Sequence, residues 1–425
     1  MPCYHIWTIG CQMNKADSER IGSYLEQIGC LATPRAEEAE IIVLNSCVVR
    51  QSAENRVVNK LSALKSLKRG PQNPVLALTG CMVNSRVDGL RHRFPHVDLF
   101  FQPQAVEELG QFLAARGLAS APKPGSLLPL HPSPSTFVPV IEGCDNFCSY
   151  CIVPYRRGRE RSRPIEDIVC EVRLLVERGA REITLLGQNV DSYGHDLPTR
   201  PDLAQLLAEL NQIDGLARIR FLTSHPKDMG ERLIEAVAQL EKVCEHLSLP
   251  FQAGDDDILG AMRRGYSAEQ YRGLVKRIRD AIPGVALSTD VIVGFPGESE
   301  EQFEKTFDML RELGFDTVHA ACYSPRPGTI AARKLEDNVP FEEKRRRREK
   351  IEALQESIAS EINSRLLGKT VEILVEARKK GKWQGRTRTD KLVFFSDDGD
   401  HLGRLVKVKI EKTSPWALQG GLERS

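Results

Sequence analysis

The chain has 425 residues and alternates short apolar runs with longer amphipathic runs, a pattern that restricts its fold more than any other feature. In the first part, apolar runs at 4–9, 41–44 and 75–78 are each followed by a helix-like stretch, such as 53–67. This order favours parallel strands, because parallel neighbours need long crossover connections that are usually helices. We therefore predict an N-terminal parallel α/β domain over residues 1–117.

The alternation resumes in the central part of the chain, over residues 138–365. Six apolar runs are candidate strands, at residues 138–141, 182–186, 219–222, 246–249, 286–293 and 317–321. Amphipathic stretches between them are candidate helices, including residues 165–178, 203–211, 268–281 and 301–313. About six βα units are fewer than the eight of a closed TIM barrel. We therefore predict a partial, TIM-like (βα)6 barrel.

A proline-rich stretch lies between the two α/β regions. Residues 118–137 contain five prolines and no acidic residue, which predicts an extended linker. After a last long helical pattern, glycine-punctuated segments of alternating hydrophobicity predict a small antiparallel, OB-like β-barrel over residues 366–425. Three such segments are evident, at residues 371–375, 392–395 and 405–410.

Composition narrows the class of protein. Hydrophobic residues make up 41% and charged residues 28%, which is typical of a globular chain rather than a disordered one. The apolar runs are far shorter than the ~20 residues that cross a bilayer, and the N-terminus lacks a secretory signal pattern. We therefore expect a cytoplasmic protein without a membrane partner. Eleven cysteines in such a chain favour metal ligands or buried thiols over disulfides.

Three cysteines share one local context in the N-terminal region. Cys11, Cys47 and Cys81 each follow directly after a predicted strand, beside a small residue. In an open parallel sheet, ligands bind at the carboxyl ends of the strands, so these thiols can converge on one point. The alternative is three buried structural cysteines, since a free cysteine packs as a small hydrophobe. Three thiolates would leave one iron of a four-iron cluster without a protein ligand.

Cys144, Cys148 and Cys151 form a C-x3-C-x2-C loop directly after the first predicted barrel strand. Such a loop can curl three thiolates around one iron–sulfur cube, again with one iron left open. A zinc finger needs a histidine about twelve residues after its second cysteine, but the next histidine is His195. A thioredoxin-like pair would leave Cys144 unexplained. The spacing therefore favours iron–sulfur over zinc.

With Tyr150 just before its third cysteine, the loop resembles the radical-SAM superfamily. Over residues 5–422 the chain resembles the methylthiotransferase family, most closely the branch that acts on N6-dimethylallyladenosine in tRNA. The motifs that carry this resemblance are GCQMN at 10–14, NSCVVR at 45–50, GCM at 80–82, IVPYRRGRERSR at 152–163 and LGQNVDSYG at 186–194.

The resemblance implies two [4Fe-4S] clusters and S-adenosylmethionine (SAM) as cofactors. The loop trio would hold the cluster that cleaves SAM to a radical, and the N-terminal trio would hold an auxiliary cluster carrying the sulfur to be transferred. An electron donor of the flavodoxin or ferredoxin type and a sulfur source are implied as partners. By resemblance, the SAM contacts are Tyr150, Gln188, Ser224, Gln252, Asp290 and Gly294.

Local basic blocks predict an RNA partner although the formal net charge is only +1. One block follows the cysteine loop, another precedes the C-terminal barrel at 344–348, and a third lies within the barrel. Phosphate contact and base stacking are how such modules bind single-stranded loops. The alternative is a solvated helix face. The predicted RNA contacts are Arg156, Arg157, Arg159, Lys379, Lys380, Lys382, Arg386 and Arg388.

The implied reaction is transfer of a methylthio group to C2 of N6-dimethylallyladenosine next to the anticodon, in the anticodon stem-loop of tRNA. Within the enzyme class, the alternatives are methylthiolation of threonylcarbamoyl-adenosine in tRNA or of an aspartate of a ribosomal protein. From another class, the chain would be a zinc-stabilised RNA-binding protein without catalysis.

Overall fold

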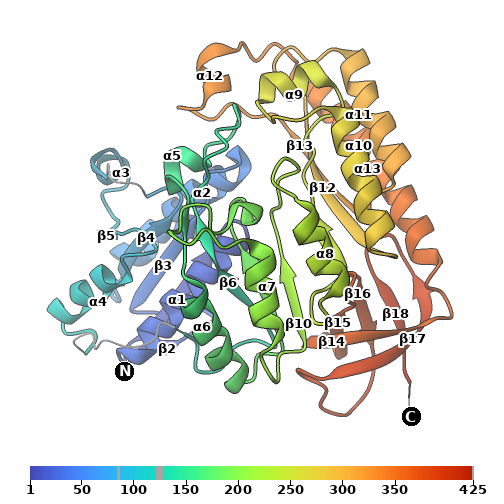
Figure 1. Ribbon diagram of the computed structural model, residues 1–425. Coiled ribbons are helices and arrows are strands. Elements are labelled where there is room, and N and C mark those ends of the chain that lie inside the picture. The colour runs from blue at the N-terminus through green and yellow to red at the C-terminus, as the bar shows by residue number, and fades with distance from the viewer. Residues whose placement is uncertain (84–86, 121–127, 424–425) are drawn as a thin grey trace. The chain divides into compact units, whose positions relative to one another are not determined.

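The computed structural model describes residues 1–83, 87–120 and 128–423, which fall into two compact units (Figure 1). The first unit comprises Met1–His131 and Cys151–Arg159, and the second comprises Pro132–Tyr150 and Glu160–Ser425. A short segment after the cysteine loop thus packs with the N-terminal unit. Part of the expected linker, with Pro122 and Pro124, lies outside the described residues.

The first unit contains the predicted parallel sheet, with strand order β2-β1-β3-β4-β5. Its strands are β1 (Cys3–Thr8), β2 (Leu31–Ala32), β3 (Ile41–Ser46), β4 (Val75–Gly80) and β5 (Leu99–Phe100). Its helical elements are α1 (Gln12–Gln27), η1 (Ala36–Glu38), α2 (Gln51–Arg69), α3 (Asp88–Arg93), α4 (Val106–Ala115) and α5 (Val153–Arg157).

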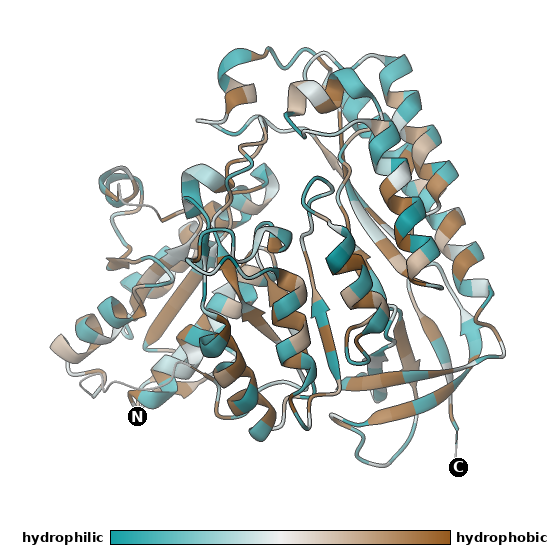
Figure 2. Cartoon of the chain, viewed as in Figure 1, coloured by the Kyte–Doolittle hydropathy of each residue, from teal (hydrophilic) through white to brown (hydrophobic). Residues whose placement is uncertain are grey.

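Both faces of this sheet are covered, which explains why its central strands are apolar throughout. Ile42 and Leu44 of β3 pack with α2, whereas Ile41 and Val43 pack with α1 and α4. Side chains alternate between the two faces of a strand, so a strand covered on both faces needs a continuous apolar run. Figure 2 shows this hydrophobic colouring along β3.

The second unit begins with six parallel strands, as predicted for a partial barrel. They form two sheets, β10-β9-β6 and β11-β12-β13, and a parallel bridge between Ile219 and Val243 continues from one to the other. The strands are β6 (Ser135–Pro139), β9 (Glu182–Leu186), β10 (Arg218–Phe221), β11 (His246–Ser248), β12 (Ala286–Val293) and β13 (Thr317–Cys322). Strand β6 starts inside the expected linker, so the end of that stretch is ordered structure.

Helices connect these strands and lead to the C-terminal barrel. They are α6 (Ile165–Glu177), α7 (Leu203–Asn211), α8 (Glu231–Gln239), α9 (Asp256–Met262), α10 (Ala268–Ala281), α11 (Glu300–Leu313), α12 (Ile330–Lys334) and α13 (Phe341–Ser364). The remaining short elements are β7 (Ile141–Glu142), β8 (Arg161–Ser162) and η2 (Val190–Ser192). Within the described residues, no helix is both long and apolar enough to cross a bilayer.

The C-terminal part is a closed five-stranded barrel in the order β14-β15-β16-β18-β17. Its strands are β14 (Thr370–Lys379), β15 (Lys382–Arg386), β16 (Leu392–Phe395), β17 (Leu405–Thr413) and β18 (Leu418–Leu422). The pairing is antiparallel except between β16 and β18, which run parallel. Trp383 and Phe395 point into the barrel core, and the Trp383 indole donates to the Asp397 carbonyl.

Two buried arginines of β10 hold the C-terminal barrel against the partial (βα)6 barrel. Arg218 donates to the carbonyl oxygen of Arg386 at 2.7 Å, and Arg220 donates to those of Thr387 and Arg388 at 2.6 and 2.8 Å. Because a buried guanidinium that loses its acceptors is costly, these bonds fix how the small barrel is docked.

Candidate functional site

The cysteines of the first trio lie at the carboxyl ends of three neighbouring strands, as predicted. Cys11 follows β1 and caps α1, Cys47 follows β3, and Cys81 follows β4. The Cys81 amide donates to the Ser46 carbonyl at 2.8 Å, which ties the ends of β3 and β4 together. The structure thus brings together three thiols that are far apart in the sequence.

A buried amide network fixes these three strand ends. The Asn14 side chain donates to the Asn45 side chain at 2.9 Å and to the Ser46 carbonyl at 3.1 Å. Asn45 returns a bond to the Asn14 carbonyl at 2.8 Å, and the Ser46 hydroxyl donates to the Thr79 carbonyl at 2.5 Å. Every link joins two of the three cysteine-bearing segments, so the network positions the thiols. Sequence reasoning did not identify these polar residues, although each stands within the recognised motifs.

Glycines beside two of the cysteines allow the close approach of these loops. A Cβ on Gly10 would lie 2.2 Å from the Asn14 amide oxygen and 2.9 Å from the Cys47 Cβ. Gly80 has φ +90°, and a Cβ there would lie 2.3 Å from the Ser46 carbonyl. Both positions therefore exclude larger side chains.

The thiols of the trio lie near one another. Burial is the main cause that raises the pKa of Cys47 to about 12, and the neighbouring Cys81 and Cys11 contribute to the same rise. Burial also raises the pKa of Cys81. Such thiols stay protonated at neutral pH until a metal displaces the proton. The three thiols therefore lie near one another at one edge of the sheet.

The second set of cysteines lies in the loop after β7. Cys144 and Cys148 are close enough that Cys148 raises the pKa of Cys144, although burial is the main cause of its rise to about 11. Cys151 follows three residues later and is half-buried. The structure thus shows two of the three predicted loop cysteines close to each other.

Residues from distant parts of the sequence, one after β9 and two at the end of α9, hold this loop in place. The Gly143 amide donates to the Gln188 side chain at 2.5 Å. Ser149 donates through its amide to the Met262 carbonyl at 3.0 Å and through its hydroxyl to the Ala261 carbonyl at 2.7 Å. Gln188, a predicted SAM contact, therefore has a bond of its own to the cysteine loop.

Arg264 is a buried cation at the cysteine loop that the sequence did not reveal. Its guanidinium donates to the Cys148 sulfur at 3.4 Å and to the Pro250 carbonyl at 2.8 Å, and its Nε donates to the Tyr266 hydroxyl at 3.0 Å. Only 5% of the residue is exposed. Hydrogen bonds to cluster sulfurs are among the factors that set reduction potentials. Arg264 stands in no motif of the resemblance, so only the fold could place it.

The other predicted SAM contacts lie at or beside strand ends of the partial barrel. Ser224 donates to Asp191 at 2.8 Å, and burial raises the pKa of Asp191 to about 7. Asp290 lies on β12, and its carbonyl accepts the amide of Gln252 at 3.0 Å. Gln252 has φ +72°, and its buried side-chain oxygen has no hydrogen-bond partner within the described residues. That open acceptor makes Gln252 the best placed of these residues to bind a ligand donor.

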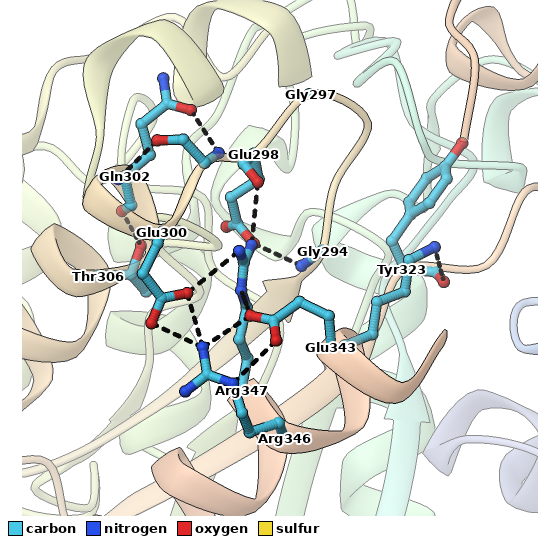
Figure 3. Close-up of polar contacts among 12 residues, drawn as sticks. Gly294, Gly297, Glu298, Glu300, Gln302, Thr306, Tyr323, Glu343, Arg346 and Arg347 are labelled. Atoms are coloured by element: carbon cyan, nitrogen blue, oxygen red, sulfur yellow. Dashed lines mark hydrogen bonds and ion pairs between the residues drawn. The ribbon is translucent and has the colours of Figure 1, made fainter. Parts of the chain in front are cut away.

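Gly294 has a structural reason of its own to be glycine. It has φ +68°, and a Cβ there would lie 2.2 Å from the Lys344 side chain. Its amide donates to Glu298 at 2.6 Å, and Glu298 in turn accepts from Arg347 at 2.8 Å (Figure 3). Arg347 is 5% exposed and also pairs with Glu343. Two members of the basic run at 344–348 therefore pack inside the protein.

The predicted RNA contacts of the small barrel divide into two groups. Lys379, Lys380 and Lys382 are exposed around the tight turn between β14 and β15. Arg386 instead donates to the Asp390 carbonyl, and Arg388 forms a two-pronged pair with Glu245 at 2.7 and 2.8 Å. The lysines are thus available to phosphate, whereas Arg388 bridges the small barrel to the partial barrel.

The basic residues after the cysteine loop also divide. Arg159 is exposed and Arg156 is half-buried. Arg157 is only 6% exposed and pairs with the buried Asp17 at 2.8 Å. A guanidinium that is buried and paired in this way is less accessible to phosphate than that of Arg159.

Three family profiles match separate parts of the chain. The Radical SAM superfamily matches residues 138–310, the TRAM domain matches residues 364–422, and the uncharacterized protein family UPF0004 matches residues 3–102. Among solved structures, the chain is similar to a radical S-adenosylmethionine methyltransferase, TsrM, from Kitasatospora setae. The TM-score is 0.55 at 14% identity, over 78% of this chain and 73% of that one. This likeness supports the fold alone.

Curated relatives match over nearly the whole length. A tRNA-2-methylthio-N(6)-dimethylallyladenosine synthase from Dehalococcoides mccartyi is 53% identical over 99% of each chain. Proteins of the same name from a Roseiflexus species and from Carboxydothermus hydrogenoformans are 52% and 46% identical, over 99% of this chain and 90% and 99% of theirs. The chain therefore belongs to the radical-SAM family of tRNA-2-methylthio-N(6)-dimethylallyladenosine synthases.

Proposed function

We propose that this chain transfers a methylthio group to C2 of N6-dimethylallyladenosine next to the anticodon of tRNA. The observation that carries the proposal is identity of about half, over nearly the full length, to curated synthases of that name. The dimethylallyl-adenosine relatives favour this substrate over threonylcarbamoyl-adenosine or a ribosomal-protein aspartate. A non-catalytic zinc protein does not fit the family.

Two cysteine sites support a two-cluster enzyme. We assign the auxiliary [4Fe-4S] cluster to Cys11, Cys47 and Cys81, and the SAM-binding [4Fe-4S] cluster to Cys144, Cys148 and Cys151. When bound, the clusters and SAM supply the radical that abstracts hydrogen from adenine C2 and the sulfur that replaces it. The side-chain hydrogen bonds of Asn14 and Asn45 would keep the cysteine-bearing segments of the auxiliary site in position.

Substrate and cofactor binding fall to other residues of the chain. The open oxygen of Gln252 would accept a hydrogen bond from SAM. The other proposed SAM contacts are Tyr150, Gln188, Ser224, Asp290 and Gly294. Positive charge for the phosphates of the anticodon stem-loop would come from the exposed lysines of the β14–β15 turn and from Arg156 and Arg159. We assign the side chain of Arg388 to docking of the small barrel instead, because it pairs with Glu245, whereas that of Arg386 pairs with Asp390 and Glu376 within the small barrel.

The reaction needs partners that supply electrons and sulfur. An electron donor of the flavodoxin or ferredoxin type would reduce the clusters, and a sulfur source would restore the transferred atom. We place the reaction in the cytoplasm because its proposed substrate, tRNA, is there.

The substrate is tested by incubating the anaerobically reconstituted protein with SAM, a reductant, sulfide and candidate acceptors. The acceptors are tRNA bearing dimethylallyl-adenosine, tRNA bearing threonylcarbamoyl-adenosine, and ribosomal protein. Mass spectrometry of the digested products should find the methylthio group on dimethylallyl-adenosine alone. Product on either other acceptor, with none on dimethylallyl-adenosine, would overturn the assignment.

A further inference from the structure

The segment Cys151–Arg159 begins at the third cysteine of the radical loop yet belongs to the N-terminal unit. It contains the short helix α5 and ends in exposed residues such as Arg159. Arg157 differs from Arg159, because only 6% of its side chain is exposed whereas Arg159 is exposed. A charged side chain is rarely buried unless it meets a partner, so the contacts of Arg157 need an explanation.

The guanidinium of Arg157 reaches into the auxiliary cysteine site. Its Nη2 donates to Oδ2 of Asp17, in the helix that starts after Cys11, at 2.8 Å. Burial is the main cause that raises the pKa of the Cys81 thiol, which lies close enough that the Arg157 cation lowers it in part. The Nη1 of Arg157 is fully buried and has no well-aligned acceptor among residues 1–83, 87–120 and 128–423. One buried donor group is thus left over beside a cysteine of the trio.

A buried Arg–Asp pair is weak evidence of stabilisation, because desolvating two charges costs about as much as their attraction returns. The leftover donor makes that cost larger, since an unsatisfied buried N–H group is destabilising. A [4Fe-4S] cluster bound by thiolates is anionic, and its sulfurs accept hydrogen bonds. A cluster at the trio would therefore supply the acceptor that Arg157 lacks in the protein alone.

We propose that Arg157 is a positioning residue of the auxiliary cluster, with Asp17 orienting its guanidinium and its remaining N–H groups donating to sulfur at the Cys81 corner. This inference rests on the proposed function, since it requires a cluster at the trio. A cation that donates to cluster sulfur stabilises the more negative reduced state, so Arg157 raises the reduction potential. The role is distinct from phosphate binding by the exposed Arg159.

The test uses the full-length protein with Cys144, Cys148 and Cys151 replaced by alanine, so that only the auxiliary cluster forms. Arg157→Lys and Arg157→Gln are compared in this background with Arg35→Gln, which changes an exposed arginine of the same unit. Reduction is followed by electron paramagnetic resonance during a potentiometric titration. We expect a more negative midpoint potential in both Arg157 variants, larger for glutamine, and no shift in the control.

Binding of tRNA by the otherwise native protein is measured in parallel for Arg157→Gln and Arg159→Gln. We expect weaker binding only for Arg159→Gln. An unchanged potential in both Arg157 variants would overturn the inference, as would a loss of tRNA affinity equal to that of Arg159→Gln without a potential shift. If Arg157→Gln does not fold, Arg157→Lys decides, because lysine keeps a charge for Asp17 but loses the planar fork.

The same experiment gives a different result if the proposed function is wrong. A background protein with native Arg157 that binds no cluster at Cys11, Cys47 and Cys81 would overturn the two-cluster assignment, and the Arg157 inference with it. A background protein that binds the cluster, with variants of unchanged potential, would overturn only the role of Arg157.

Discussion

The two cysteine sites are built in opposite ways. The auxiliary trio is assembled from the ends of β1, β3 and β4, and a buried network of Asn14 and Asn45 holds it. The radical trio lies in one short loop, which distant residues such as Gln188 clamp from outside. The cysteines of the first site meet only when the sheet is folded, whereas those of the second are close together in the sequence. We therefore expect the two sites to respond differently to substitution.

The two sites nevertheless share one structural feature. Each has a buried arginine at one sulfur, Arg157 at Cys81 and Arg264 at Cys148. Both arginines are anchored by a second partner, the Asp17 carboxylate in one case and the Pro250 carbonyl in the other. We therefore expect the two cysteine trios to have different chemical roles. We expect Arg157 and Arg264 to have the same role, donation to sulfur.

The largest effect is expected from Cys148→Ala. Loss of one of three thiolates removes the cluster of the radical loop, so SAM cleavage should fall to the background level. The auxiliary trio is built on separate strands and should keep its iron, about half of the total. Cleavage is measured as 5′-deoxyadenosine by chromatography and mass spectrometry. Cleavage at the wild-type rate would show that the loop does not hold the SAM-cleaving cluster.

Cys47→Ala should have the opposite effect: it should impair the auxiliary site and leave the radical loop intact. SAM cleavage should continue, because the radical loop is intact, but it should become uncoupled and give no methylthio product. Nucleoside analysis of tRNA together with the 5′-deoxyadenosine yield measures the coupling. Full product from this variant would contradict the assignment of the transferred sulfur to the N-terminal unit.

A smaller effect is expected from Arg264→Gln, which removes the donor to Cys148. The cluster of the radical loop should form but become harder to reduce, and SAM cleavage should slow by about 10-fold, as is common when a residue behind a metal ligand is changed. Arg263→Gln is the matched control, because Arg263 is exposed. If Arg264→Gln and Arg263→Gln had the same cluster reduction potential and the same rate of SAM cleavage, Arg264 would have no role at the site.

Sequence patterns predicted most of the fold because its central strands are buried on both faces. The runs at 182–186 and 286–293 coincide with β9 and β12, because most positions of both strands are buried and apolar residues therefore predominate in them. Strands β15 and β18 were missed because they are polar and rich in glycine. A Cβ on Gly385 would lie 2.2 Å from the Leu374 carbonyl, so close packing in the small barrel demands a residue that weakens the strand signal.

The candidate site was predictable where it depends on spacing and not where it depends on packing. The strand-end position of Cys11, Cys47 and Cys81 followed from the βα pattern alone. The arginines at the sulfurs could not be predicted in the same way. Arg157 stands in a basic run typical of RNA binding, and only its burial against Asp17 separates it from Arg159.

The central claim is that each trio holds a cluster of its own. Iron and sulfide analysis after anaerobic reconstitution tests it most directly, on the native chain and on two variants that each have one trio replaced by alanine. The account predicts about eight irons in the native protein and about four in each variant, with matching sulfide. A native protein with only four irons, or a variant in which loss of one trio empties both sites without unfolding the chain, would contradict it.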